Sequence, residues 1–312
     1  MARGKPISFP PEAEELPSPV VDNHTHFPGQ GDGAVELPDG VEVLPMDVQV
    51  GRAERAGVVG MIHSGCEYPG LEHAVELARE WRQIAAAIAI HPNEAPRHAG
   101  VTEVAPDGWE QDLADHHREV SLEDAIGRVA ELAAANPEQV VAIGETGMDL
   151  FRTAAGGLEA QRRSFRAHIA LAKELDLPLQ IHNREAHAEV LDVLQRDGAP
   201  ARTVFHCFSG DAEFAGVLNE NGWYASFAGP VTFKSNQELR DAARALRPEL
   251  VLVETDAPYL TPAPFRGRPN APYVMTHTVR TVAQEMGMEL TQACQVILAN
   301  TRHVYGDWFT QA

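Results

Sequence analysis

Short runs of apolar residues recur along the chain, and most are followed by a longer segment with helical spacing. The first run leads into Asp22, His24 and His26, which occupy every second position. Side chains two residues apart on a strand point to the same face of that strand. We therefore expect these three side chains to converge just beyond a buried strand, where two imidazoles can hold a metal ion.

The apolar runs predict eight strands, at residues 18–21, 58–62, 85–90, 140–143, 179–181, 203–205, 223–227 and 250–253. Segments whose apolar residues recur with helical spacing lie between nearly all consecutive strands. They predict helices at residues 46–56, 71–83, 121–136, 158–175, 185–196, 211–221 and 237–246, and two more helices follow the last strand at 274–286 and 291–299. Eight strands alternating with helices predict a parallel sheet closed into an α/β, (β/α)8 TIM barrel. We expect residues 1–18 to be a flexible N-terminal tail and residues 19–312 to form a single domain.

Composition narrows the class of protein. The 312 residues carry a formal net charge of −20 at pH 7, which argues against a protein that coats DNA through lysines and arginines. The three cysteines form no closely spaced pair, so we expect a reducing compartment rather than a disulfide framework. No signal peptide and no apolar run of membrane-spanning length is evident. We expect a cytoplasmic protein with no membrane association and no obligate protein partner.

Polar residues accumulate at the predicted carboxyl ends of the strands. The residues found there are His24, His26, His91, Glu145, His182, His206 and Asp256. In a barrel these ends form one ring around the axis, and active sites are built on that ring. Histidines and carboxylates that meet there suit a pair of divalent ions bridged by a carboxylate, and Glu145 is the candidate bridge. The sequence thus predicts a metal site at the C-terminal ends of the strands.

Several motifs in order along the chain resemble those of the TatD-type metal-dependent deoxyribonucleases. They are Asp-x-His-x-His at 22–26, Ile-His-Pro at 90–92, Gly-Glu-Thr-Gly-Met-Asp at 144–149, Ile-His-Asn-Arg at 181–184, His-Cys-Phe-Ser-Gly at 206–210 and Glu-Thr-Asp-Ala-Pro-Tyr-Leu-Thr-Pro at 254–262. The resemblance covers residues 20 to 309. It implies a TIM-barrel hydrolase of the amidohydrolase superfamily that cleaves phosphodiester bonds of DNA, as a 3′–5′ exonuclease on single-stranded DNA or RNA.

The resemblance also implies roles for individual residues and a cofactor of two divalent ions, Mg, Mn or Zn. His24 and His26 would bind the first metal together with Asp256, and His182 and His206 would bind the second. Glu145 would bridge the two metals. Asp256 would also act as the general base, so the implied catalytic residues are Asp256 and Glu145.

Binding of a nucleic-acid substrate requires groups that hold phosphate, and the planar guanidinium of arginine does so through two parallel hydrogen bonds. Arg184 follows the fifth strand, and Lys234, Arg266 and Arg268 lie in loops after the seventh and eighth strands. We expect these four residues to form a local basic rim. His91 is expected to face the substrate as well, with a buried core histidine as the alternative.

Two insertions, at residues 28–40 and 94–120, follow the first and third strands and should hang over the mouth of the site. We interpret the acidic second insertion, with His98, His116 and His117, as a solvated loop or short helix, with a metal-binding tract as the alternative. Because such insertions could exclude long polyanions, a hydrolase of a small amide, ester or phosphodiester substrate is the second functional hypothesis. A catalytically inert scaffold is the third, and the retention of all six metal ligands argues against it.

Overall fold

The computed structural model describes residues 7–27, 37, 41–110 and 112–310. Eight parallel strands pair in the order of the sequence and form the barrel that the apolar runs predict. Their bounds are β1 (Val20–Thr25), β2 (Val58–Gly65), β3 (Ile84–Ile88), β4 (Val140–Asp149), β5 (Leu179–Arg184), β6 (Thr203–Phe205), β7 (Tyr224–Phe227) and β8 (Val251–Val253). The (β/α)8 fold class is confirmed.

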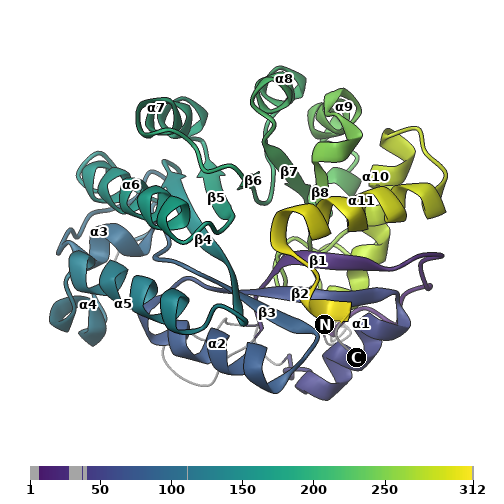
Figure 1. Ribbon diagram of the computed structural model, residues 1–312, viewed down its shortest axis with the longest axis horizontal. Helices are drawn as coiled ribbons and strands as arrows, with labels where there is room; N and C mark the ends of the chain where they lie inside the picture. The colour runs from purple at the N-terminus through teal and green to yellow at the C-terminus, as the bar shows by residue number, and fades with distance from the viewer. Residues whose placement is uncertain (1–6, 28–36, 38–40, 111, 311–312) are drawn as a thin grey trace, which may run out of the picture.

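Helices surround the strands, as Figure 1 shows. Their bounds are α1 (Met46–Arg55), α2 (Leu71–Glu80), α3 (Glu94–His98), α4 (Asp115–Glu119), α5 (Leu122–Ala135), α6 (Leu158–Glu174), α7 (His187–Asp197), α8 (Ala212–Asn221), α9 (Gln237–Ala245), α10 (Thr276–Glu285) and α11 (Leu290–Tyr305). Local signals set several helix ends. The Ser121 side chain accepts a hydrogen bond from the backbone N–H of Asp124 at the start of α5, and Gly222 ends α8 at a φ of 69°.

Most strands bury both faces, because one faces the barrel interior and the other faces the helices. All five residues of β3 are buried, for example, and the apolar faces of α2 and α5 pack outside it. Strands of this kind read as continuous apolar runs in the sequence, and this is why they could be recognised there. No helix in the described part of the chain is long and apolar enough to cross a membrane.

The carboxyl ends of several strands extend further than the apolar runs predict. β4 continues to Asp149 and β5 to Arg184, and the two strands still pair there, Gly147 with His182 and Asp149 with Arg184. The apolar runs stop earlier because polar residues such as Glu145, Asp149 and His182 occur near the ends of these strands. As a result, several candidate ligands lie on paired strands rather than on loops.

The barrel is completed between β8 and β1 by individual hydrogen bonds near the carboxyl ends of these strands. The Asp256 N–H donates to the His24 carbonyl at 3.0 Å, and the Asn23 side chain donates to the Val253 carbonyl at 2.8 Å. The Asp22 carboxylate accepts the Thr255 N–H at 2.8 Å. Asp22 therefore does not converge with the histidines as predicted, because pairing of β1 with β2 is irregular after Asp22.

The expected flexible tail differs from the prediction in its second half. Residues 1–6 lie outside the described residues, but Leu16 is buried, and Tyr273 donates from its hydroxyl to the Pro10 carbonyl at 2.6 Å. Glu12 also forms an ion pair of 2.8 Å with Arg55 on α1. Residues 9–16 are therefore packed on the barrel. The predicted loop at 28–40 falls almost entirely outside the described residues.

We expect Asn23→Ala to lower the free energy of unfolding by about 2 to 4 kcal/mol, because it leaves the buried Val253 carbonyl without its partner. Urea denaturation followed by circular dichroism would measure the loss. Asn221→Ala is a control, since that amide contacts a carbonyl on the exposed surface of α8. Equal stability of the two variants would contradict a structural role for the β1–β8 closure.

Candidate metal centre

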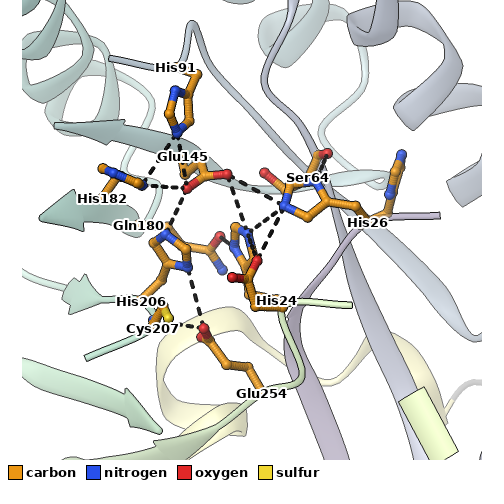
Figure 2. Close-up of polar contacts among 12 residues, drawn as sticks. His24, His26, Ser64, His91, Glu145, Gln180, His182, His206, Cys207 and Glu254 are labelled. Carbon is orange, nitrogen blue, oxygen red and sulfur yellow. Dashed lines mark hydrogen bonds and ion pairs between the residues drawn. The ribbon is translucent and has the colours of Figure 1, made fainter. Parts of the chain in front are cut away.

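The carboxylate of Glu145, on β4, lies at the centre of the site (Figure 2). Its Oε1 atom is 3.6 Å from His24 Nε2 and 3.5 Å from His26 Nε2. Its Oε2 atom is 2.6 Å from His206 Nε2 and 3.1 Å from His182 Nδ1. Each carboxylate oxygen thus faces a different pair of imidazoles, and this arrangement suits a carboxylate that bridges two cations.

Asp256, just after β8, completes the group. Its Oδ1 atom lies 3.5 Å from His26 Nε2 and 3.9 Å from His24 Nε2. The structure therefore brings together all six residues that the sequence predicts as metal ligands. The ligating atoms of these six residues and of His91 fall into three groups whose members lie within 4.8 Å of one another: His24, His26 and Glu145; His24, His206 and Asp256; and His91, Glu145 and His182.

Hydrogen bonds outside the centre determine which nitrogen of each ring faces Glu145. His24 Nδ1 lies 2.9 Å from Gln180 Oε1, and His26 Nδ1 lies 3.2 Å from the Ser64 carbonyl. Because both partners only accept, each Nδ1 carries the proton and each Nε2 keeps a free lone pair. Gln180 and the Ser64 backbone were missed because they come from β5 and β2 and carry no ligand signature.

The second pair of histidines is oriented by carboxylates. His206 Nδ1 lies 3.3 Å from Glu254 Oε1, so Nε2 faces Glu145. The His182 ring has the opposite orientation to that of His206. Its Nε2 lies 3.1 Å from Asp149 Oδ2, and its Nδ1 faces Glu145. Asp149 was not predicted to take part in the site. A carboxylate behind an imidazole fixes the ring and raises its basicity, which strengthens metal binding.

His91 differs from the other histidines at the centre. Its Nδ1 atom accepts the Asn93 N–H at 3.0 Å, so the proton of the neutral ring lies on Nε2. That nitrogen faces His182 Nδ1 at 3.3 Å and Glu145 Oε2 at 3.7 Å. Burial lowers the pKa of His91 to about 4, which keeps the ring neutral. Such a ring is a hydrogen-bond donor at the wall of the cavity, as a residue that faces the substrate would be.

Opposite charges attract the carboxylates and imidazoles of the centre to one another. Although burial alone would lower it, the pKa of His206 is raised well above its usual value by Glu145 and Glu254. Burial alone would raise the pKa of Glu145, but the surrounding histidines hold it well below the usual range. The pKa values of His26 and His182 are also raised, in spite of burial, by their carboxylate partners. Imidazole and carboxylate donors so arranged fit divalent transition metals, which would replace these protons.

The centre opens into a cavity of about 700 Å³. Arg184 lines this cavity, and its guanidinium lies 3.9 Å above the ring of Phe151. Lys234, Arg266 and Arg268, which we expected on the same rim, are exposed and do not line it. Arg152, which lines the cavity, was not predicted, because it lies outside the recognised motifs.

The structure places Arg266 and Arg268 on neighbouring aromatic rings. The Arg266 guanidinium lies 3.9 Å from the Phe233 ring and the Arg268 guanidinium 5.7 Å from the Phe265 ring. Of the four residues expected to form a basic rim, Arg184 alone therefore lies at the cavity wall. The loop after β8 places its two arginines against aromatic side chains instead. These contacts could not be read from the sequence.

The raised pKa values of three histidines in the centre determine whether metal binding strengthens or weakens as the pH falls. Since the pKa values of His26, His182 and His206 lie above 6.5, binding a cation must displace protons near neutral pH. We expect affinity for Mn²⁺ to fall as the pH is lowered from about 8 to about 6, with protons released when the cation binds. Calorimetry in buffers of different ionisation enthalpy would measure both. A pH-independent affinity would contradict this assignment.

We expect Asp149→Asn to weaken metal binding about 10- to 100-fold, because the neutral amide no longer raises the basicity of His182. Competition with a chromophoric chelator would measure the affinity. Asp192→Asn is the matched control, since Asp192 pairs with Arg196 on the surface of α7. If the folded Asp149 variant bound metal as tightly as the parent, Asp149 would have no part in the centre.

Comparison with known proteins agrees with this geometry. The family model described as TatD related DNase matches residues 21–306. A metal-dependent hydrolase named TatD from Mycobacterium tuberculosis is 37% identical over 302 residues, covering 94% of this chain and 100% of the relative. The hydrolase YabD of Bacillus subtilis is 34% identical over 287 residues, covering 92% and 98%.

The crystal structure of YjjV, a TatD homologue from Escherichia coli, superposes with a TM-score of 0.74 at 24% identity, covering 92% of this chain and 98% of that one. The family match spans nearly the whole chain, and both bacterial relatives are named as metal-dependent hydrolases. The candidate ligands lie within the matched residues. The chain therefore belongs to the TatD family of metal-dependent hydrolases.

Proposed function

We propose that this protein is a metal-dependent nuclease that removes nucleotides from the 3′ end of single-stranded DNA or RNA. The observation that carries the proposal is the position of Glu145, which faces two pairs of imidazoles from its two oxygens beside Asp256. Membership of a family whose model is described as a DNase supports the substrate class.

In this proposal His24, His26 and Asp256 would hold one divalent cation, His182 and His206 would hold the other, and Glu145 would lie between them. When bound, two such cations, Mg²⁺, Mn²⁺ or Zn²⁺, stabilise negative charge on the phosphate and lower the pKa of a water molecule. Hydrolysis then requires a base for the water and donors for the phosphate, which the chain supplies.

Asp256 is the proposed base. Although burial alone would raise it, the pKa of Asp256 is held below its usual value by a hydrogen bond to His26 and by the nearby histidines, so the side chain is a carboxylate at neutral pH. It lines the cavity and lies where a water molecule between it and the phosphate could transfer a proton to it. The pKa of Tyr259, which also lines the cavity, is raised to about 12 by burial, so its hydroxyl stays protonated.

Arg184 and His91 are the proposed phosphate-binding groups. Stacking on Phe151 fixes the plane of the Arg184 guanidinium and leaves its edge for two parallel hydrogen bonds. His91 offers a neutral Nε2–H near Glu145 Oε2. Together they can bind a phosphate in the cavity, Arg184 with a full positive charge and His91 as a neutral donor.

A hydrolase of a small amide, ester or phosphodiester substrate is the alternative. It is favoured by the positions of Lys234, Arg266 and Arg268, which do not line the cavity and so leave few cations for a polynucleotide backbone. An inert scaffold is disfavoured, since the ligating side chains are retained and converge.

The test is a digestion assay with protein that has been stripped of metal and reloaded with Mg²⁺, Mn²⁺ or Zn²⁺. We expect a ladder from 5′-labelled single-stranded DNA and RNA that disappears when the 3′ end is blocked. Asp256→Asn should lower kcat roughly 10²- to 10⁴-fold, because the general base is lost. Arg184→Ala should weaken substrate binding roughly 10- to 100-fold, as expected for a charged hydrogen bond.

Arg266→Ala is the matched control, because this stacked arginine is exposed and outside the cavity. Hydrolysis of small phosphodiesters or esters without cleavage of any oligonucleotide, by protein shown to hold metal, would favour the alternative. Equal effects of Arg184→Ala and Arg266→Ala on oligonucleotide binding would contradict the phosphate-binding role of Arg184.

A further inference from the structure

A second cluster of ligating side chains lies in the insertion that follows β3, and it shares no residue with the metal centre. Glu94 and His98 belong to α3, and His116 and His117 belong to α4. Their ligating atoms all lie within 4.8 Å of one another. Figure 1 shows these two short helices next to each other on one flank of the barrel, beside α5.

This part of the insertion is not solvated, contrary to our interpretation of the sequence. Glu94, His98 and His117 are each only 4% exposed, and Leu122 at the start of α5 is buried nearby in the chain. The acidic residues of the insertion had suggested an exposed tract. A buried carboxylate surrounded by imidazoles requires compensation from hydrogen bonds, ion pairs or a cation.

The hydrogen bonds of His98 leave one of its nitrogens ready to bind a metal. His98 Nδ1 lies 2.8 Å from the Val120 carbonyl, which can only accept, so Nδ1 carries the proton. The lone pair on Nε2 is therefore free. This Nε2 atom is buried and has no hydrogen-bond partner among the described residues. Buried polar atoms are seldom left without a partner, which points to a ligand at this position.

His116 presents a similar nitrogen to the same point. Its Nε2 atom is buried and without a hydrogen bond in the described chain, at 3.8 Å from Glu94 Oε2. That separation is too long for a hydrogen bond but suits two ligands of one cation. The rings of His98 and His116 have their centroids 5.7 Å apart, so both can face a common ion.

His117 has a different part in the cluster. Its Nδ1 atom accepts the Ala114 N–H at 3.0 Å, so Nε2 carries the proton and donates to Glu94 Oε2 at 2.7 Å. Arg97 donates to the other oxygen of Glu94 at 2.5 Å. Burial would raise the pKa of Glu94, but its histidine and arginine partners lower it, so the side chain is a carboxylate. His117 and Arg97 thus orient an ionised Glu94.

We propose that Glu94, His98 and His116 form a separate binding site for a divalent transition metal, with Zn²⁺ as the best match to two imidazoles and one carboxylate. Three protein ligands leave one tetrahedral position for water or another donor. A cation there would join α3 to α4 and so fix the insertion against the barrel. Because Glu94 follows His91 by one helical turn, the same cation would also stabilise the backbone that presents His91 to the cavity.

The test compares the zinc content of the whole protein with that of His116→Gln. Each protein would be incubated with Zn²⁺ alone, passed through a desalting column and analysed by inductively coupled plasma mass spectrometry. We expect the variant to hold one equivalent less than the parent, with the metal centre around Glu145 unaffected. His303→Gln, at an exposed position of α11, is the control and should retain the parental content.

His117→Gln separates a ligand from an orienting residue. It should still bind the additional zinc, about 10- to 100-fold more weakly, since it loses the hydrogen bond that orients Glu94. Anomalous diffraction at the zinc edge from crystals of the parent should show a peak between Glu94, His98 and His116. Equal zinc content in folded His116→Gln, or no peak there while the metal centre is occupied, would overturn the proposal. If His116→Gln did not fold, the anomalous map alone would decide.

Discussion

One buried carboxylate organises the candidate centre. Glu145 lies within 3.7 Å of the rings of His24, His26, His91, His182 and His206, and no single strand could supply so many partners. The closed barrel brings them together, because the carboxyl ends of its strands form one ring. Outside that ring, acceptors such as Gln180 and Glu254 determine which nitrogen of each imidazole turns inward. The chemistry of the centre thus depends on side chains that are not themselves candidate metal ligands.

Much of this arrangement could be predicted from the sequence. Apolar runs gave the strands, because parallel strands bury both faces, and polar residues at their ends gave the ligands. The strand ends were less predictable, since β4 continues to pair through Asp149 although its residues become polar. Asp22 was misplaced because an irregularity in β1 breaks the alternation on which that prediction depended. The partners of the imidazole rings come from other strands and leave no local pattern.

The remaining differences between the predictions and the structure concern residues in loops. The sequence gives the position of a charged residue along a loop but not its direction, so Arg266 was expected at the cavity and instead lies on Phe233. Cys207 lines the cavity at a φ of 42°, although strand alternation would turn it outward, because the backbone leaves the strand geometry after β6. Burial raises the pKa of its thiol, which keeps the thiol protonated at neutral pH. In the insertion after β3, Glu94, His98 and His117 are buried although the surrounding sequence is acidic, because His117 donates to Glu94 and His98 bonds to the Val120 carbonyl.

The closure of the barrel between β8 and β1 has a consequence for biosynthesis. Hydrogen bonds from Asp256 and Thr255 reach back to residues of the first strand, so the ring of ligands is incomplete until both have been made. During translation the first histidines leave the ribosome more than two hundred residues before Asp256. A nascent chain would therefore expose its earliest ligands for most of its synthesis without a site to retain a cation. Loading of the finished centre must follow release of the last strand.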